Sequence, residues 1–283
     1  MNILSIQSWV SFGHVGNASA VFPMQRLGHE VWAVNTVQFS NHTGYGDWRG
    51  QVYTGDAIRE LVEGIADRGV LGTCDAVLSG YMGDADIGTA ILDAVAKVRA
   101  VNPDALYCCD PVMGDVGRGV FVRPGIPEFM KAHAVPAADV ITPNHYELEL
   151  LAGREARTLS ELDVALAEVH AQGPRFILVT SLHLDETPDG SLDLLVSERG
   201  GKRWRVRTPL LGVEISGAGD ATAALFFVHL LQTRDPRLAV ARAASSVYGL
   251  LRRTEEAGSR EILTVAAQDE FVTPTTLFEA EEV

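Results

Sequence analysis

The feature that most constrains the fold is a regular alternation of short apolar segments with segments of helical periodicity, roughly 30 residues apart. The apolar segments are residues 2–7, 31–39, 75–79, 105–109, 140–144 and 176–179. Helical spacing lies between them, as in residues 57–66 and 87–99. This alternation predicts an α/β fold with a central, mostly parallel sheet and helices on both faces. Two later segments, 192–196 and 203–207, predict a hairpin.

The chain shows no linker or shift in composition, so we expect residues 1–283 to form one domain. Its net charge of −14 argues against nucleic-acid and anionic-membrane partners, which require basic patches. No apolar run is long enough to span a membrane, and the first residues do not resemble a signal peptide. Cys74, Cys108 and Cys109 have no zinc-like spacing, and we expect them to be buried thiols in the reducing cytoplasm.

Polar residues recur where the predicted parallel strands end. They are Ser8, residues 40–44, Tyr81, Asp110, Asn144 and Thr180. Open α/β sheets bind their ligands along this edge. The clustering therefore indicates an enzyme with a cleft at the carboxyl ends of the strands.

Residues 216–231 combine a glycine turn, an acid and an almost wholly apolar segment. Gly217 and Gly219 permit unusual backbone angles, and Asp220 stands in the first turn of the predicted helix. One interpretation is a capped core helix. The other is an anion site beside a carboxylate, which suits phosphoryl transfer to a hydroxyl group. The chain contains no P-loop motif, no dinucleotide-binding glycine motif and no nucleophile elbow.

The chain resembles the pyridoxal kinases along nearly its whole length. The segments that carry this resemblance are Ser5-Ile6-Gln7-Ser8, residues 35–46 (NTVQFSNHTGYG), Leu78-Ser79-Gly80-Tyr81, residues 110–114 (DPVMG), residues 141–144 (ITPN) with Glu147 and Glu149, and Gly217-Ala218-Gly219-Asp220. The glycine turn is common to ribokinase-like kinases, whereas residues 35–46 are specific to pyridoxal kinases. The resemblance implies a ribokinase-like sandwich that uses MgATP to phosphorylate the 5′-hydroxymethyl group of pyridoxal, pyridoxine and pyridoxamine.

The same resemblance implies catalytic and vitamer-binding roles. Asp220 would be the general base, and Gly217, Ala218 and Gly219 would offer N–H groups to the transferred phosphate. A helix N-terminus should keep Asp220 ionised and therefore a weak base. The residues expected to bind the vitamer are Ser8, Val15, Thr43, Gly44, Tyr81 and Asp220, whereas His42 is interpreted as an ordinary loop residue.

ATP and its metal are expected beside them. The expected ATP contacts are Asp110, Thr142, Asn144, Glu147, Thr180, Ser181, Arg207, Thr208, Pro209 and Leu210. Asp110 and Glu147 would hold Mg²⁺, and a monovalent cation is an additional cofactor to test. Residues 114–123 would form a flap over the phosphates. Some relatives have Lys at the position of Thr180, so this chain lacks one positive contact to ATP. The resemblance also implies a homodimer.

Two alternatives stay open. The nearest is another ribokinase-like enzyme, such as a hydroxymethylpyrimidine kinase or a sugar kinase, and residues 35–46 argue against it. The other is a non-catalytic protein that binds B6 vitamers. Asp220 with both neighbouring glycines argues against this second alternative, because binding alone requires no base.

Overall fold

A single mixed sheet organises the computed structural model, which describes residues 1–212 and 215–283. Its spatial order is β12 (Glu281–Glu282), β11 (Arg203–Pro209), β10 (Ser191–Glu198), β9 (Phe176–Leu182), β8 (Val140–Ile141), β5 (Leu106–Cys109), β4 (Cys74–Ser79), β1 (Asn2–Val10), β2 (Glu30–Phe39) and β3 (Gly50–Val52). The strands from β9 to β2 are parallel, and β10 and β11 form the predicted hairpin. The predicted parallel centre is thus confirmed, with antiparallel strands added at both edges.

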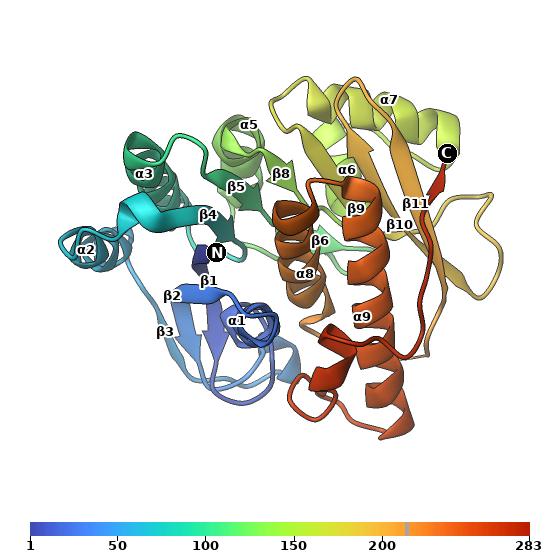
Figure 1. Ribbon diagram of the computed structural model, residues 1–283, viewed down its shortest axis with the longest axis horizontal. Helices are drawn as coiled ribbons and strands as arrows, with labels where there is room; N and C mark the ends of the chain where they lie inside the picture. Colours follow the sequence, from blue (N-terminus) through green and yellow to red (C-terminus); the bar gives the residue numbers. More distant parts are fainter. Residues whose placement is uncertain (213–214) are drawn as a thin grey trace.

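Helices cover both faces of this sheet (Figure 1). One face carries α1 (Asn17–Arg26), α8 (Ala218–Thr233) and α9 (Pro236–Glu256). The other carries α2 (Gly55–Ala66), α3 (Ala85–Val101), α4 (Ile126–Phe129), α5 (Val135–Ala137), α6 (His145–Ala152) and α7 (Leu159–His170). Successive strand residues point to opposite faces, so Cys108 and Cys109 enter different cores and are unpaired thiols.

Helix α8 is buried on every side. All its residues from Ala221 to Leu231 are buried, because the helix packs between the sheet, α1 and α9. An apolar sequence without a polar stripe is typical of such a position, and this prediction is confirmed. The helix therefore gives a rigid support to the glycine turn at its start.

The start of α1 shows how tertiary contacts can override a local pattern. Asn17 follows a glycine turn, a pattern that favours a capping residue, yet Gly16 occupies the N-cap and makes no side-chain cap. Asn17 is instead buried, with its amide donating to the Val34 carbonyl at 3.0 Å and its oxygen accepting from Ser5 at 2.7 Å. The Asn17 side chain thus hydrogen-bonds to residues of β1 and β2 rather than to the N–H groups at the helix end.

The chain after α9 forms a tail that reaches across the molecule. In Figure 1 the tail passes beside α9 and ends at β12, the edge strand paired with β11. Ile262 and Phe271 from this segment enter the core beside α8. None of the described helices combines the length and apolar character needed to cross a bilayer.

Candidate active site

Residues from separate strand ends meet at the carboxyl edge of the parallel sheet. Asp110 follows β5 and Thr142 follows its neighbour β8. The Thr142 hydroxyl donates to Asp110 Oδ1 at 2.9 Å, and both residues are buried. Two predicted ATP contacts, 32 residues apart in the chain, are therefore one hydrogen-bonded pair.

Glu147 is held by backbone N–H groups. It forms a capping box with Asn144 at the start of α6, where Glu147 Oε2 accepts from the Asn144 N–H at 2.9 Å. Its other oxygen accepts from the Met113 N–H at 2.8 Å. Glu147 is only 4% exposed, so it is not a solvated helix residue. This carboxylate ties α6 to the segment that follows β5.

Three acids lie close enough to affect one another. Burial raises the pKa of Asp110 well above its usual range, and the charges of Glu147 and Asp220 raise it further. Burial likewise raises the pKa of Glu147 to about 7, although its backbone hydrogen bonds oppose the shift. Within residues 1–212 and 215–283, no Lys, Arg or His forms an ion pair with any of these carboxylates.

A bound cation would relieve this concentration of negative charge. Asp110 offers an oxygen that accepts no hydrogen bond from the described residues, whereas both oxygens of Glu147 already accept backbone N–H groups. The described residues contain no cluster of three or more metal-binding side chains. Mg²⁺ usually takes one or two carboxylates together with phosphate oxygens and water. The donor set therefore fits a magnesium ion that arrives with a nucleotide.

The glycine turn packs against the loop between β1 and α1. Gly217 caps α8 with φ 91°, where a Cβ would overlap the His14 carbonyl oxygen. Ser19 Oγ donates to the Gly217 carbonyl at 2.7 Å. Only glycine fits this left-handed, tightly packed position. The turn is thus fixed in place, and among the described residues the N–H groups of Ala218 and Gly219 have no hydrogen-bond partner.

Asp220 contacts the same loop. Its carboxylate accepts the Gly16 N–H, and burial nevertheless raises the pKa of Asp220 above its usual value. The expectation that the helix end makes Asp220 a weak base is therefore wrong in direction, because desolvation outweighs the N–H groups. Gly16 has φ 57°, and a Cβ on it would overlap the Ser8 hydroxyl. Gly16 consequently lies between Ser8 and Asp220, and the three residues form one wall.

An apolar group adjoins this wall. Val15 packs with Val10, Val37 and Phe39, and the ring of Tyr81 lies against them. The predicted vitamer contacts from β1, from its following loop and from the end of β4 are thereby brought together. Among the described residues, no hydrogen bond reaches the hydroxyl groups of Ser8, Thr43 or Tyr81. These three hydroxyls are available to a ligand.

The turn Thr43–Tyr45 is connected to the glycine turn by a residue that the sequence reading left aside. The Gly44 N–H donates to His42 Nδ1 at 3.2 Å, and Ser216 Oγ lies 3.1 Å from the same nitrogen. Ser216 immediately precedes Gly217 but lies 174 positions from His42. No local sequence signal could have identified this contact.

The segment after Asp110 forms a small ribbon. Strands β6 (Gly114–Asp115) and β7 (Gly119–Val120) pair with each other, and the Asn144 amide donates to the Gly114 carbonyl at 2.9 Å. The Arg118 guanidinium lies 4.9 Å from the Phe121 ring. This position beside the acids suits the predicted flap, whose movement stays a prediction.

Thr180 and Ser181 continue the same edge on β9. The Thr180 N–H donates to the Pro143 carbonyl at 2.9 Å, which places Thr180 beside Asn144. Ser181 is exposed and has φ 49°, an uncommon angle for a residue with a side chain. Strained residues of this kind cluster at functional edges.

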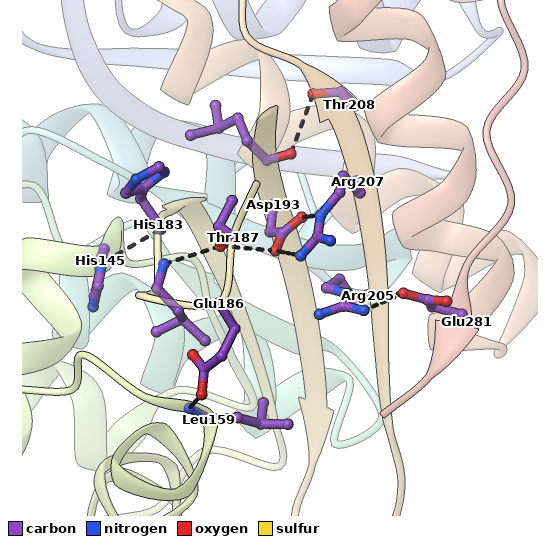
Figure 2. Close-up of polar contacts among 12 residues, drawn as sticks. His145, Leu159, His183, Glu186, Thr187, Asp193, Arg205, Arg207, Thr208 and Glu281 are labelled. Carbon is purple, nitrogen blue, oxygen red and sulfur yellow. Dashed lines mark hydrogen bonds and ion pairs between the residues drawn. The ribbon is translucent and has the colours of Figure 1, made fainter. Parts of the chain in front are cut away.

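Arg207 is engaged inside the sheet, as Figure 2 shows. Its Nε and Nη2 donate to the two oxygens of Asp193 at 2.7 Å each, and the buried Asp193 also accepts from Thr187. The Arg207 charge is thus already balanced. Thr208 lies beside it, and exposed Leu210 donates its N–H to the Gly190 carbonyl at 2.8 Å. Contact of residues 207–210 with ATP stays a prediction.

Comparison with known proteins agrees with this geometry. Residues 54–265 match the family described as phosphomethylpyrimidine kinase. The chain is 68% identical to pyridoxal kinase PdxY of Granulibacter bethesdensis, with 99% of each chain covered. It is 58% identical to pyridoxal kinase PdxY of Rubrobacter xylanophilus, covering 100% of this chain and 98% of that one. Pyridoxal kinase from Leishmania donovani, in complex with ADP and pyridoxamine, superposes with a TM-score of 0.92 at 31% identity and covers 100% and 99% of the two chains.

Proposed function

The chain belongs to the PdxY pyridoxal kinases of the phosphomethylpyrimidine kinase family, and we propose that it transfers the γ-phosphoryl group of ATP to the 5′-hydroxymethyl group of pyridoxal. Pyridoxine and pyridoxamine would be further acceptors. The observation that carries this proposal is that Asp110 and Glu147 are both buried at the carboxyl edge of the sheet, where the charge of Asp220 from the glycine turn also raises the pKa of Asp110. A protein that only bound the vitamer would have no need to bury Asp110 and Glu147 within reach of the charge on Asp220.

Asp220 would accept the proton of the vitamer hydroxyl. Its carboxylate is held by the Gly16 N–H, and its raised pKa makes it a stronger base than an exposed aspartate. The N–H groups of Gly217, Ala218 and Gly219 would meet the transferred phosphoryl group. Phosphoryl transfer depends chiefly on positioning and on stabilisation of charge, which these fixed groups supply.

Asp110 and Glu147 would serve magnesium. A magnesium ion would neutralise phosphate charge while ATP is bound. Asp110 has the free oxygen for direct contact, and the N–H bonds on Glu147 suit contact through water. Thr142 would orient Asp110, and Asn144 would keep Glu147 in place.

The remaining ATP contacts are proposed along β9 and β11. They are Thr180, Ser181, Arg207, Thr208, Pro209 and Leu210. Because the Asp193 pair balances the Arg207 charge, we propose that this stretch contributes its backbone and apolar surface to the nucleotide. A monovalent cation, a homodimer and a cytoplasmic location complete the proposal.

The vitamer would lie between the apolar group and the turn Thr43–Tyr45. Ser8 and Thr43 would hydrogen-bond to its polar substituents, with Gly44 beside Thr43, while Tyr81 stacks on the ring and Val15 lines it. Among the described residues the hydroxyls of Ser8 and Thr43 make no hydrogen bond, which supports these roles.

A vitamer-competition assay tests the function. With MgATP, the purified protein is expected to convert pyridoxal into pyridoxal 5′-phosphate, and hydroxymethylpyrimidine should be a much poorer acceptor. Turnover of hydroxymethylpyrimidine well above that of pyridoxal would favour the nearest rival. Tight binding of pyridoxal without any product would leave a binding protein instead.

A further inference from the structure

The carboxylate of Glu261 joins two loops that lie far from it in the sequence. Its Oε2 accepts the His14 N–H at 3.3 Å, and its Oε1 accepts the Tyr45 hydroxyl. The Arg260 guanidinium lies over the Tyr45 ring, 5.0 Å from its centroid. A segment from the end of the chain therefore contacts the loop after β1 and the turn Thr43–Tyr45 together.

Glu261 stands on a rigid base. Ile262, the next residue, is buried in the core beside α8. Ser259 Oγ donates to the Glu261 carbonyl at 2.7 Å, and the Leu263 N–H donates to Thr254 Oγ1 at 3.1 Å. Thr254 is itself fully buried in α9. The carboxylate is thus held by the helical layer, whereas the turn Thr43–Tyr45 that it contacts is exposed.

Both loops carry proposed vitamer contacts. Tyr45 ends the short turn that begins with Thr43, so fixing its hydroxyl also fixes Thr43. His14 directly precedes Val15 and Gly16, which meet the vitamer wall and Asp220. The loops also pair through the Phe12 N–H and the Ser40 carbonyl at 2.8 Å.

Gly13 leaves room for the carboxylate. Its φ is 87°, and a Cβ there would overlap Glu261 Oε2. Any side chain at this position would displace the acid or the loop. The close approach requires glycine at position 13, as well as the acid at position 261.

We propose that Glu261 is a positioning residue for the vitamer, holding the loop of residues 11–16 and the turn Thr43–Tyr45 at the separation that the vitamer ring requires. This inference rests on the proposed function, since it assigns the vitamer to the space between these loops. Glu261 acts through Tyr45 and the His14 N–H and touches neither ATP nor the transferred group.

Glu261→Ala is expected to raise KM for pyridoxal about tenfold, because it removes the hydrogen bonds that hold both loops. The dissociation constant for pyridoxal without ATP should rise equally. Tyr45→Phe should have a smaller effect, and Glu261→Gln should lie between wild type and Glu261→Ala, since an amide oxygen still accepts from Tyr45. The double variant Glu261→Ala/Tyr45→Phe should bind pyridoxal no more weakly than Glu261→Ala, because Tyr45→Phe removes only a contact that Glu261→Ala has already removed.

Asp269→Ala is the matched control. Asp269 is an acid of the same C-terminal region, but its side chain is 91% exposed, and among the described residues its one ion pair is with Arg26 at 3.3 Å. The pyridoxal KM of Asp269→Ala should stay within about twofold of the wild-type value. The kcat and the KM for ATP of Glu261→Ala should also stay within about twofold of wild type.

Two outcomes would overturn the inference. One is a pyridoxal KM in Glu261→Ala that equals the wild-type value. The other is a parallel change of kcat and both KM values with a lower Tm, which would indicate a purely structural role. Suppose that the wild type forms no product but Glu261→Ala still binds pyridoxal more weakly than the wild type does. This pair of results would support the inference while refuting the proposed function.

Discussion

The two ends of the site are built differently. At the phosphoryl end, Asp110, Thr142 and Glu147 are buried and bonded to neighbouring strands and helices, and Gly217 starts the buried helix α8. At the proposed vitamer end, the turn Thr43–Tyr45 is exposed, and side-chain contacts from distant segments hold it. On the proposed function, the phosphoryl chemistry would rest on regular elements and the choice of substrate on loops, which can vary without disturbing the core.

The largest effect is expected at the phosphoryl end. Asp220→Asn should lower kcat by about 10²–10⁴-fold, because an amide cannot accept the hydroxyl proton. Steady-state kinetics and pyridoxal titration would show lost turnover with retained binding. Near-wild-type turnover would remove Asp220 from the role of base. The raised pKa of Asp220 also predicts that wild-type turnover falls as pH drops through that value, because only the ionised carboxylate can accept a proton.

The next effect concerns the helix behind the glycine turn. Burial lowers the pKa of His229 in α8 to about 4, below its usual 6.5. As the pH falls below 6.5, His229 binds a proton in the unfolded chain but not in the folded chain. The free energy of unfolding therefore decreases until the pH reaches about 4, where the folded chain also binds the proton. The free energy of unfolding should fall by about 3 kcal/mol more than in His229→Leu over this range. Urea titrations at pH 7 and near pH 4 would measure this, and equal losses in both proteins would contradict it.

A pair of glycine variants tests how rigid the turn must be. Gly217→Ala should lower the free energy of unfolding by roughly 2 kcal/mol and also reduce kcat, since its left-handed backbone and the His14 carbonyl leave no room for Cβ. Gly219→Ala should keep wild-type stability, because among the described residues no atom outside its chain neighbours and its own helix backbone lies within 4 Å of the added Cβ. Thermal unfolding of both variants compares them. If the two melt alike, the turn is less constrained than its packing indicates.

The smallest effect is expected at the vitamer end. Ser8→Ala should raise the pyridoxal KM by roughly tenfold or less, the value of one neutral hydrogen bond, and leave kcat and the KM for ATP unchanged. Initial rates at varied pyridoxal and ATP would test it. A loss confined to kcat would move Ser8 from substrate binding to the chemical step and blur the contrast between the two ends.

The sequence determined the parallel sheet, the hairpin of β10 and β11, and the buried nature of α8, because hydrophobic periodicity reports directly which side of each element faces a core. It also pointed to the strand ends and the glycine turn as the site. These features depend on local order along the chain.

Only the tertiary structure decided how those residues act. Asn17 follows a glycine turn, a pattern that favours a helix cap, yet the structure buries it in a hydrogen bond to Val34. The structure also raises the pKa of Asp220, where the helix end alone predicted a weak base. It also brought Ser216 to His42 and Glu261 to Tyr45 across 174 and 216 positions. Desolvation and long-range contacts depend on what surrounds a residue in space, and no spacing in the sequence encodes that surrounding.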